Sequence, residues 1–128
     1  MHVPGLIRGL TRASNFSPLM RGLDPRIQGR FAKAMPHWVY ILASQRNGTL
    51  YVGVTRDLPK RMYEHRNGLT GGFTRQYGVH RLVFAEPHET AVAAIQREKN
   101  IKHWPRRWKL ALIERENPLW EDLYDQLV

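Results

Sequence analysis

The sequence predicts an α+β domain in which a small three-stranded antiparallel sheet is flanked by helices. Two strand-like runs, Val39–Leu42 and Leu50–Val54, surround Asn47-Gly48, which is a strong hairpin signal. A third strand-like run covers residues 81–86, and helical spacing dominates most of the chain after residue 57. Because a small antiparallel sheet must bury its apolar surface, we expect the helices to pack on it.

The composition indicates one compact domain with a basic surface. The chain has 128 residues, 42% of them hydrophobic, and a net charge of +9. A basic balance of this size favours polyanions, which are nucleic acid or anionic lipid, and the alternative is a soluble basic protein with no such partner. The absence of cysteine excludes a disulfide scaffold, a thiolate zinc site and a cysteine nucleophile, and agrees with the cytoplasm, where we expect the protein. No apolar run is long enough for a membrane span, so we expect no membrane partner.

Residues 1–35 are predicted to form a basic, disordered arm, and residues 36–128 the folded domain. Residues 1–34 hold six of the 20 Lys and Arg and one of the 11 acids, with scattered glycine and proline and no sustained periodicity. Three interpretations compete: an arm that binds polyanions, an Arg-rich organellar transit peptide, or a non-native extension upstream of Met35.

The predicted hairpin carries two tyrosines and a glycine whose relative positions depend on the turn. A two-residue turn at Asn47-Gly48 pairs Tyr40 with Thr55, and any loop of even length places Tyr40 and Tyr51 on the same face. Gly53 then lies between the phenols, where a missing side chain leaves room for something to approach the backbone. The alternative is that tyrosine is simply a good strand residue.

The helix that follows Asp57 and ends at Asn67-Gly68 places Arg61 and His65 on one face, beside its apolar stripe. Arginine offers a rigid fork of donors for a phosphate, and histidine can move a proton near neutral pH. The alternative is a solvated basic face. The polar, glycine-rich segment 68–78 is predicted to be a loop.

The helix Thr90–His103, which Pro105 stops, carries Glu98 on its apolar stripe. A carboxylate on a packing face is costly unless it is paired or binds a metal. Glu98 has three possible partners: Arg61, a Mg²⁺ ion that takes only one or two protein carboxylates, or a structural salt bridge. The six histidines show no metal-ligand spacing, which argues against zinc.

Two short helices are predicted at the end of the chain. The first covers residues 106–116 and ends at Asn117-Pro118. After that break, apolar residues from Trp120 to Leu127 recur at helical spacing and predict a terminal helix.

The two tyrosine motifs of the hairpin, Val39-Tyr40-Ile41 and Tyr51-Val52-Gly53, resemble the name-giving motifs of the GIY-YIG nuclease superfamily. Valine replaces the first glycine and the second isoleucine of those motifs. The resemblance covers the chain from about residue 37 to 125, in the small single-domain bacterial branch, and none of residues 1–34.

The other family motifs follow in order, and together they imply a GIY-YIG-like fold and a metal-dependent DNA endonuclease. The segment 58–68 resembles the family's arginine helix, 97–104 the segment with the metal-binding glutamate, and 116–123 the terminal asparagine motif. The implied partner is DNA, possibly structured or branched, and the alternative is a nucleic-acid-binding module with little turnover. The implied catalytic residues are Tyr40, Tyr51, Arg61, His65 and Asn117, and the implied metal ligand is Glu98, holding a single Mg²⁺ or Mn²⁺.

The resemblance also implies a role for each group. Tyr40 acts as general base towards the attacking water, and His65 accepts or relays its proton. Arg61 stabilises the pentacovalent charge, and Tyr51 orients water or phosphate. Since a phenol has a pKa near 10, Tyr40 needs the metal and Arg61 nearby. Gly53 would keep the sheet bare where a backbone phosphate lies.

Overall fold

The computed structural model describes residues 36–127, so the arm predicted over residues 1–35 lies outside the described residues. Over the described range the chain forms the predicted α+β fold, a three-stranded antiparallel sheet with helices on both faces. In chain order the elements are β1 (His37–Ala43), β2 (Leu50–Thr55), α2 (Leu58–Arg66), α3 (Gly72–Gln76), β3 (Arg81–His88), α4 (Ala91–His103), α5 (Arg106–Glu116) and the 3₁₀ helix η2 (Leu123–Leu127).

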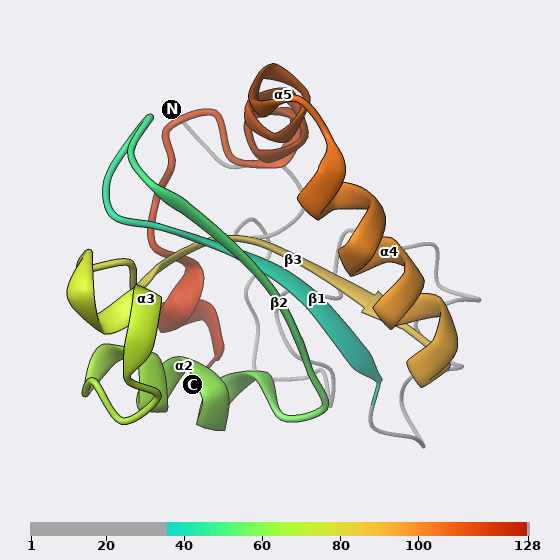
Figure 1. The fold of residues 1–128 in the computed structure, drawn as a ribbon, viewed down its shortest axis with the longest axis horizontal. Helices are drawn as coiled ribbons and strands as arrows, with labels where there is room; N and C mark the ends of the chain where they lie inside the picture. The colour runs from blue at the N-terminus through green and yellow to red at the C-terminus, as the bar shows by residue number, and fades with distance from the viewer. Residues whose placement is uncertain (1–35, 128) are drawn as a thin grey trace.

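The strand β1 lies at the centre of the sheet, which has the order β2-β1-β3. Figure 1 shows α2 and α3 on one side of this sheet and α4 and α5 on the other. Because side chains alternate along a strand, β1 supplies both cores. Tyr40 and Leu42 pack with α2, whereas Val39 and Ile41 pack with α4 and α5. The sheet therefore separates two apolar clusters, and Tyr40 belongs to the α2 side.

The hairpin differs from the prediction in its register. Tyr40 pairs with Gly53, not with Thr55, because the loop spans residues 44–49 instead of two residues. The loop is still of even length, so Tyr40 and Tyr51 share one face as expected.

The wider loop is held by its own hydrogen bonds and by a distant helix. The main-chain N–H of Ser44 donates to the carbonyl of Thr49 over 3.0 Å, which closes the loop at its base. The guanidinium of Arg106 on α5 then donates to the carbonyls of Asn47 and Gly48 over 2.8 and 2.7 Å. A tertiary contact therefore holds the loop that local sequence assigned to a tight turn.

The helix boundaries follow the capping residues that the sequence predicts. The carboxylate of Asp57 accepts a hydrogen bond from the N–H of Lys60 at the start of α2. The hydroxyl of Thr90 accepts one from the N–H of Ala93 at the start of α4. The helix α4 ends before Pro105, as expected.

Two local predictions were wrong. The segment 68–78, expected to be a loop, contains the short helix α3, whose single turn is too brief to produce a periodic pattern. The terminal segment forms only the 3₁₀ helix η2, and Trp120 lies before it with a φ of 57°. The indole of Trp120 is buried and donates to Glu114 over 2.8 Å, so packing fixes this unusual backbone. Within residues 36–127 every helix falls short of the length and apolarity that a membrane crossing needs.

Candidate active site

The phenol of Tyr40 crosses the edge strand β2 at the one position where β2 has no side chain. Tyr40 is 1% exposed, and its partner in the sheet is Gly53. A Cβ atom added to Gly53 would lie 2.5 Å from both Cζ and Oη of Tyr40. The space above Gly53 is thus filled by the tyrosine ring. The expectation that this space admits a phosphate was wrong. In the observed register Tyr40 pairs with Gly53, and its ring lies over the glycine.

A chain of hydrogen bonds links this phenol to two threonines through the buried His65; we call it the phenol–histidine chain. The Tyr40 hydroxyl lies 3.1 Å from His65 Nε2. On the other side of the imidazole, His65 Nδ1 lies 3.2 Å from Thr70 Oγ1 and 3.3 Å from Thr74 Oγ1. The three contacts place His65 between one phenol and two hydroxyls.

The pKa of His65 is lowered, chiefly by burial and then by the positive charge of Arg61. The imidazole is therefore neutral at neutral pH, with one protonated nitrogen and one acceptor nitrogen. A proton on Nδ1 can be donated to the threonine hydroxyls, which leaves Nε2 to accept from Tyr40. This arrangement lets His65 take a proton from the phenol.

The pKa of Tyr40 is raised, first by burial and next by the neighbouring Tyr51. Arg61 acts in the opposite direction, as predicted, but burial outweighs it. The phenol therefore keeps its proton at neutral pH, and Tyr40 can act as a base only if that proton leaves for another group. His65 is the group in contact with it.

Arg61 stands one helical turn before His65 on α2, at the edge of a polar hollow, the cationic cleft. Its Nε lies 3.3 Å from Glu64 Oε1, and its side chain is partly exposed. The hollow has a volume of about 280 Å³ and carries more positive than negative side chains, which suits a phosphate. It is lined by Thr55, Arg56, Asp57, Lys60, Arg61 and Glu64.

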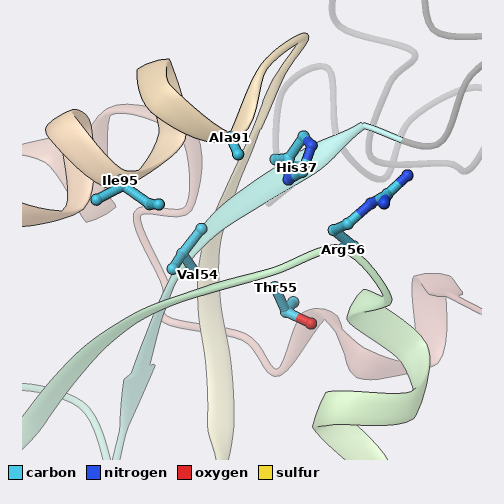
Figure 2. A pocket seen from close by; sticks show the side chains of 6 residues that line it. All are labelled: His37, Val54, Thr55, Arg56, Ala91 and Ile95. Carbon is cyan, nitrogen blue, oxygen red and sulfur yellow. The ribbon is translucent and has the colours of Figure 1, made fainter.

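A second hollow meets the cationic cleft at the end of β2, since Thr55 and Arg56 line both. It measures about 170 Å³ and lies between β2 and α4. Figure 2 shows Ala91 and Ile95 of α4 opposite Val54 in this largely apolar space.

Glu98 comes from the opposite face of the sheet, because α4 packs there through Ala94 and Ile101. Its carboxylate lies 2.7 Å from Lys102 Nζ, and Arg61 pairs with Glu64 instead. Of the partners considered for Glu98, the structure therefore shows a salt bridge within its own helix.

The carboxylate of Glu98 is nevertheless within electrostatic range of the Tyr40 phenol. It is the weakest of the influences that shift the pKa of Tyr40, and it acts in the raising direction. No group of three His, Cys, Asp or Glu that could hold a metal occurs among residues 36–127. A single carboxylate still fits Mg²⁺ or Mn²⁺, which keep several waters. Lys102 is 47% exposed, so it can move into solvent when a cation approaches the 13% exposed Glu98.

The side chain of Asn117 is fully buried, and its polar atoms form hydrogen bonds with main-chain groups. Its Nδ2 donates to the carbonyls of Val83 and Glu121 over 3.1 and 2.9 Å, and its Oδ1 accepts from the N–H of Glu121 over 3.0 Å. These bonds tie the end of α5 to β3. Asn117 thus holds the fold in place, and a direct catalytic role for it stays a prediction.

The structure therefore gathers Tyr40, Tyr51, His65 and Arg61 around α2. The Tyr51 ring centroid lies 6.3 Å from that of Tyr40 and 5.6 Å from that of His65. Sequence reasoning missed the two threonines that hold His65. Their only signal is a spacing of four residues within the glycine-rich segment 68–78. Thr70 lies just before α3 and Thr74 within it, and their hydroxyls lie 3.0 Å apart.

The sheet with its tyrosine pair, histidine and arginine defines a GIY-YIG-type domain. The family profile described as the GIY-YIG catalytic domain matches residues 36–111, and the chain belongs to this family. GIY-YIG proteins form an endonuclease superfamily that acts on nucleic acid and generally uses divalent metals.

The similar proteins carry the name UPF0213, which states no activity. A UPF0213 protein of Staphylococcus saprophyticus is 36% identical over 77 residues, covering 60% of this chain and 93% of the relative. One from Staphylococcus epidermidis is 35% identical over 78 residues, covering 61% and 94%. The solution NMR structure of a UPF0213 protein from Bacillus halodurans has 33% identity and a TM-score of 0.45, covering 69% of this chain and 93% of that one.

Proposed function

We propose that this protein is a metal-dependent endonuclease that hydrolyses phosphodiester bonds in DNA. The observation that carries the proposal is the phenol–histidine chain beside Arg61, at the edge of the cationic cleft. A buried phenol in contact with a neutral imidazole provides a base, and a neighbouring guanidinium provides a site for phosphate charge.

In the proposed reaction the proton moves along hydrogen bonds that the structure contains. The attacking water gives its proton to the Tyr40 oxygen as the phenol proton passes to His65 Nε2. The imidazolium that forms keeps its Nδ1 proton on the threonine hydroxyls. Tyr40 therefore never carries a full charge, which agrees with its raised pKa. Arg61 binds the phosphate oxygens as negative charge builds on them, and Tyr51 orients the water or phosphate.

Glu98 is the proposed ligand for Mg²⁺ or Mn²⁺, with Lys102 released into solvent. When bound, the cation supplies positive charge to the scissile phosphate and the leaving oxygen. In the absence of the cation, Lys102 keeps the carboxylate neutralised.

Nicking of supercoiled plasmid with Mg²⁺, Mn²⁺ or EDTA tests the proposal. We expect cleavage with a metal and none with EDTA, and a loss of about 100-fold or more in Arg61→Gln and in Glu98→Gln. The control Arg115→Gln removes an exposed arginine from α5 and should cleave normally. Circular dichroism must show that each variant is folded.

The same assay separates the nuclease from a binding module. DNA binding that persists in EDTA, with no cleavage under either metal on single-stranded, duplex or branched DNA, would contradict the proposal and support the module.

A further inference from the structure

Three aromatic rings lead from the active site out to solvent; we call them the aromatic ladder. Tyr51, which meets His65, packs against Phe73 with ring centroids 6.4 Å apart and planes 28° apart. Phe73 in turn packs against Tyr77 with centroids 4.9 Å apart. Phe73 is 46% and Tyr77 52% exposed. The ladder thus presents two half-exposed rings next to a catalytic phenol.

The outer rings are held in place by the same element that holds the catalytic histidine. Phe73 belongs to α3, and Tyr77 ends α3 with its N–H donating to the Phe73 carbonyl over 3.1 Å. Between them Thr74 is buried and contacts His65 Nδ1. The two outer rings of the aromatic ladder are therefore linked to the phenol–histidine chain through Thr74, although they lie on a short helix between glycines.

The surroundings of the ladder suit a phosphate backbone. Residues 65–85 contain no Asp or Glu. Arg75 lies on α3 two residues after Phe73, with its side chain beside Gly68. It is exposed, and it makes no ion pair with any residue in the described range. Exposed aromatic rings on a basic surface are the arrangement that proteins use to stack bases of single strands.

The ladder and the cationic cleft lie at opposite ends of β2. Tyr51 stands near the start of this edge strand and Thr55, which lines the cleft, at its end. Four residues of strand span about 13 Å. Tyr40, which pairs with Gly53, lies between the two ends, so one nucleic-acid strand can place a phosphate near Arg61 and its neighbouring bases on the rings.

We propose that the aromatic ladder stacks unpaired bases, so that the site takes DNA that is single-stranded next to the scissile phosphate. Bases within a duplex face their partners and cannot lie on Phe73 or Tyr77. The inference rests on the proposed function for the position of the scissile phosphate, whereas the base-stacking surface stands on the ring contacts and exposure given above.

Binding in EDTA tests the ladder without turnover. Fluorescence anisotropy of the full chain is measured with a labelled single-stranded oligonucleotide and with a duplex of the same sequence. Because one base stacked on an aromatic ring contributes a factor of about five or more, Tyr77→Ala should weaken single-strand binding roughly fivefold or more and duplex binding less than twofold. Tyr77→Phe keeps the ring and should bind like the wild type.

Tyr63 supplies the matched control, since it is 54% exposed on α2 and makes no ring contact among the described residues. Tyr63→Ala should leave both affinities unchanged. Equal losses on the two DNAs, an unchanged single-strand affinity in Tyr77→Ala, or no single-strand binding by the wild type would overturn the inference. A chain that shows the predicted binding but no cleavage with any metal would contradict the proposed nuclease and leave the stacking surface supported.

Discussion

The contact between Tyr40 and Gly53 gives the most specific prediction of this structure. In Gly53→Ala the new methyl group would lie 2.5 Å from the Cζ and Oη atoms of Tyr40, well inside van der Waals contact. The phenol is buried in a packed cluster and cannot swing into solvent. We therefore expect the ring to be displaced and its hydrogen bond to His65 to be lost.

The cost of this substitution follows from three contributions. Overpacking a buried site costs about 1–3 kcal/mol. Losing the tyrosine–histidine hydrogen bond costs about 0.5–1.5 kcal/mol. In the opposite direction, replacing a strand glycine by alanine stabilises the fold by about 0.5–1 kcal/mol, because alanine loses less backbone entropy on folding. We expect Gly53→Ala to lower the free energy of unfolding by about 0.5–4 kcal/mol and to impair cleavage.

A double-mutant cycle in urea isolates the contact. Leucine has no atoms beyond Cδ, so in a Tyr40→Leu background the added methyl group meets no phenol. Gly53→Ala should then be nearly neutral or stabilising, which gives a coupling of about 1.5–4.5 kcal/mol. If Gly53→Ala costs the same in both backgrounds, the phenol does not lie over Gly53 and the reasoning about the site is refuted.

Three further predictions concern other groups. Asn117→Ala leaves the carbonyls of Val83 and Glu121 without their donor, so we expect a loss of about 2–4 kcal/mol in urea unfolding; an unchanged midpoint would contradict the positioning role. Because the pKa of His65 is lowered on folding, the unfolded chain binds more protons below its ordinary value of about 6.5. The free energy of unfolding should therefore fall as the pH drops below about 6.5, with a smaller fall in His65→Gln; equal slopes for the two proteins would contradict this. Lys102→Gln removes the cation that competes for the proposed metal ligand, so the Mn²⁺ concentration for half-maximal cleavage should drop about two- to fivefold, and an unchanged value would count against that competition.

Local chemistry accounts for the parts of the fold that the sequence predicts well. The caps Asp57 and Thr90 and the breaker Pro105 act within a few residues of themselves, and the structure places the helix ends at them. The same holds for His65 on α2, whose spacing from Arg61 follows from helical geometry. Such local features predict the structure correctly because no contact with a distant part of the chain overrides them.

Tertiary contacts explain the parts that the sequence did not predict. The loop at Asn47-Gly48 spans six residues and is held by Arg106, which lies on α5. This wider loop moved the partner of Tyr40 from Thr55 to Gly53 and filled the space that had been expected to receive phosphate. Strand register is thus sensitive to contacts that no short window contains.

The same limit applies to the site. The spacing of Glu98 indicated a carboxylate on a packing face. Its partner Lys102 is one of several cations at comparable spacing, so the sequence alone does not identify the ion pair that the structure shows. Thr70 and Thr74 acquire their role because the bend before α3 and the single turn of α3 bring them onto His65. One turn is too short for periodicity to predict.

The central claim is that Tyr40 passes its proton to a neutral His65, and the pH dependence of single-turnover DNA cleavage at saturating Mn²⁺ tests it most directly. The rate should be high at neutral pH and decline on an acidic limb below about pH 6.5, because the pKa of His65 is lowered and its protonation removes the acceptor. In His65→Gln the neutral-pH rate should fall and the acidic limb should disappear. An acidic limb that persists in the variant, or a wild-type rate that rises only towards the pKa of a phenol near 10, would contradict the claim.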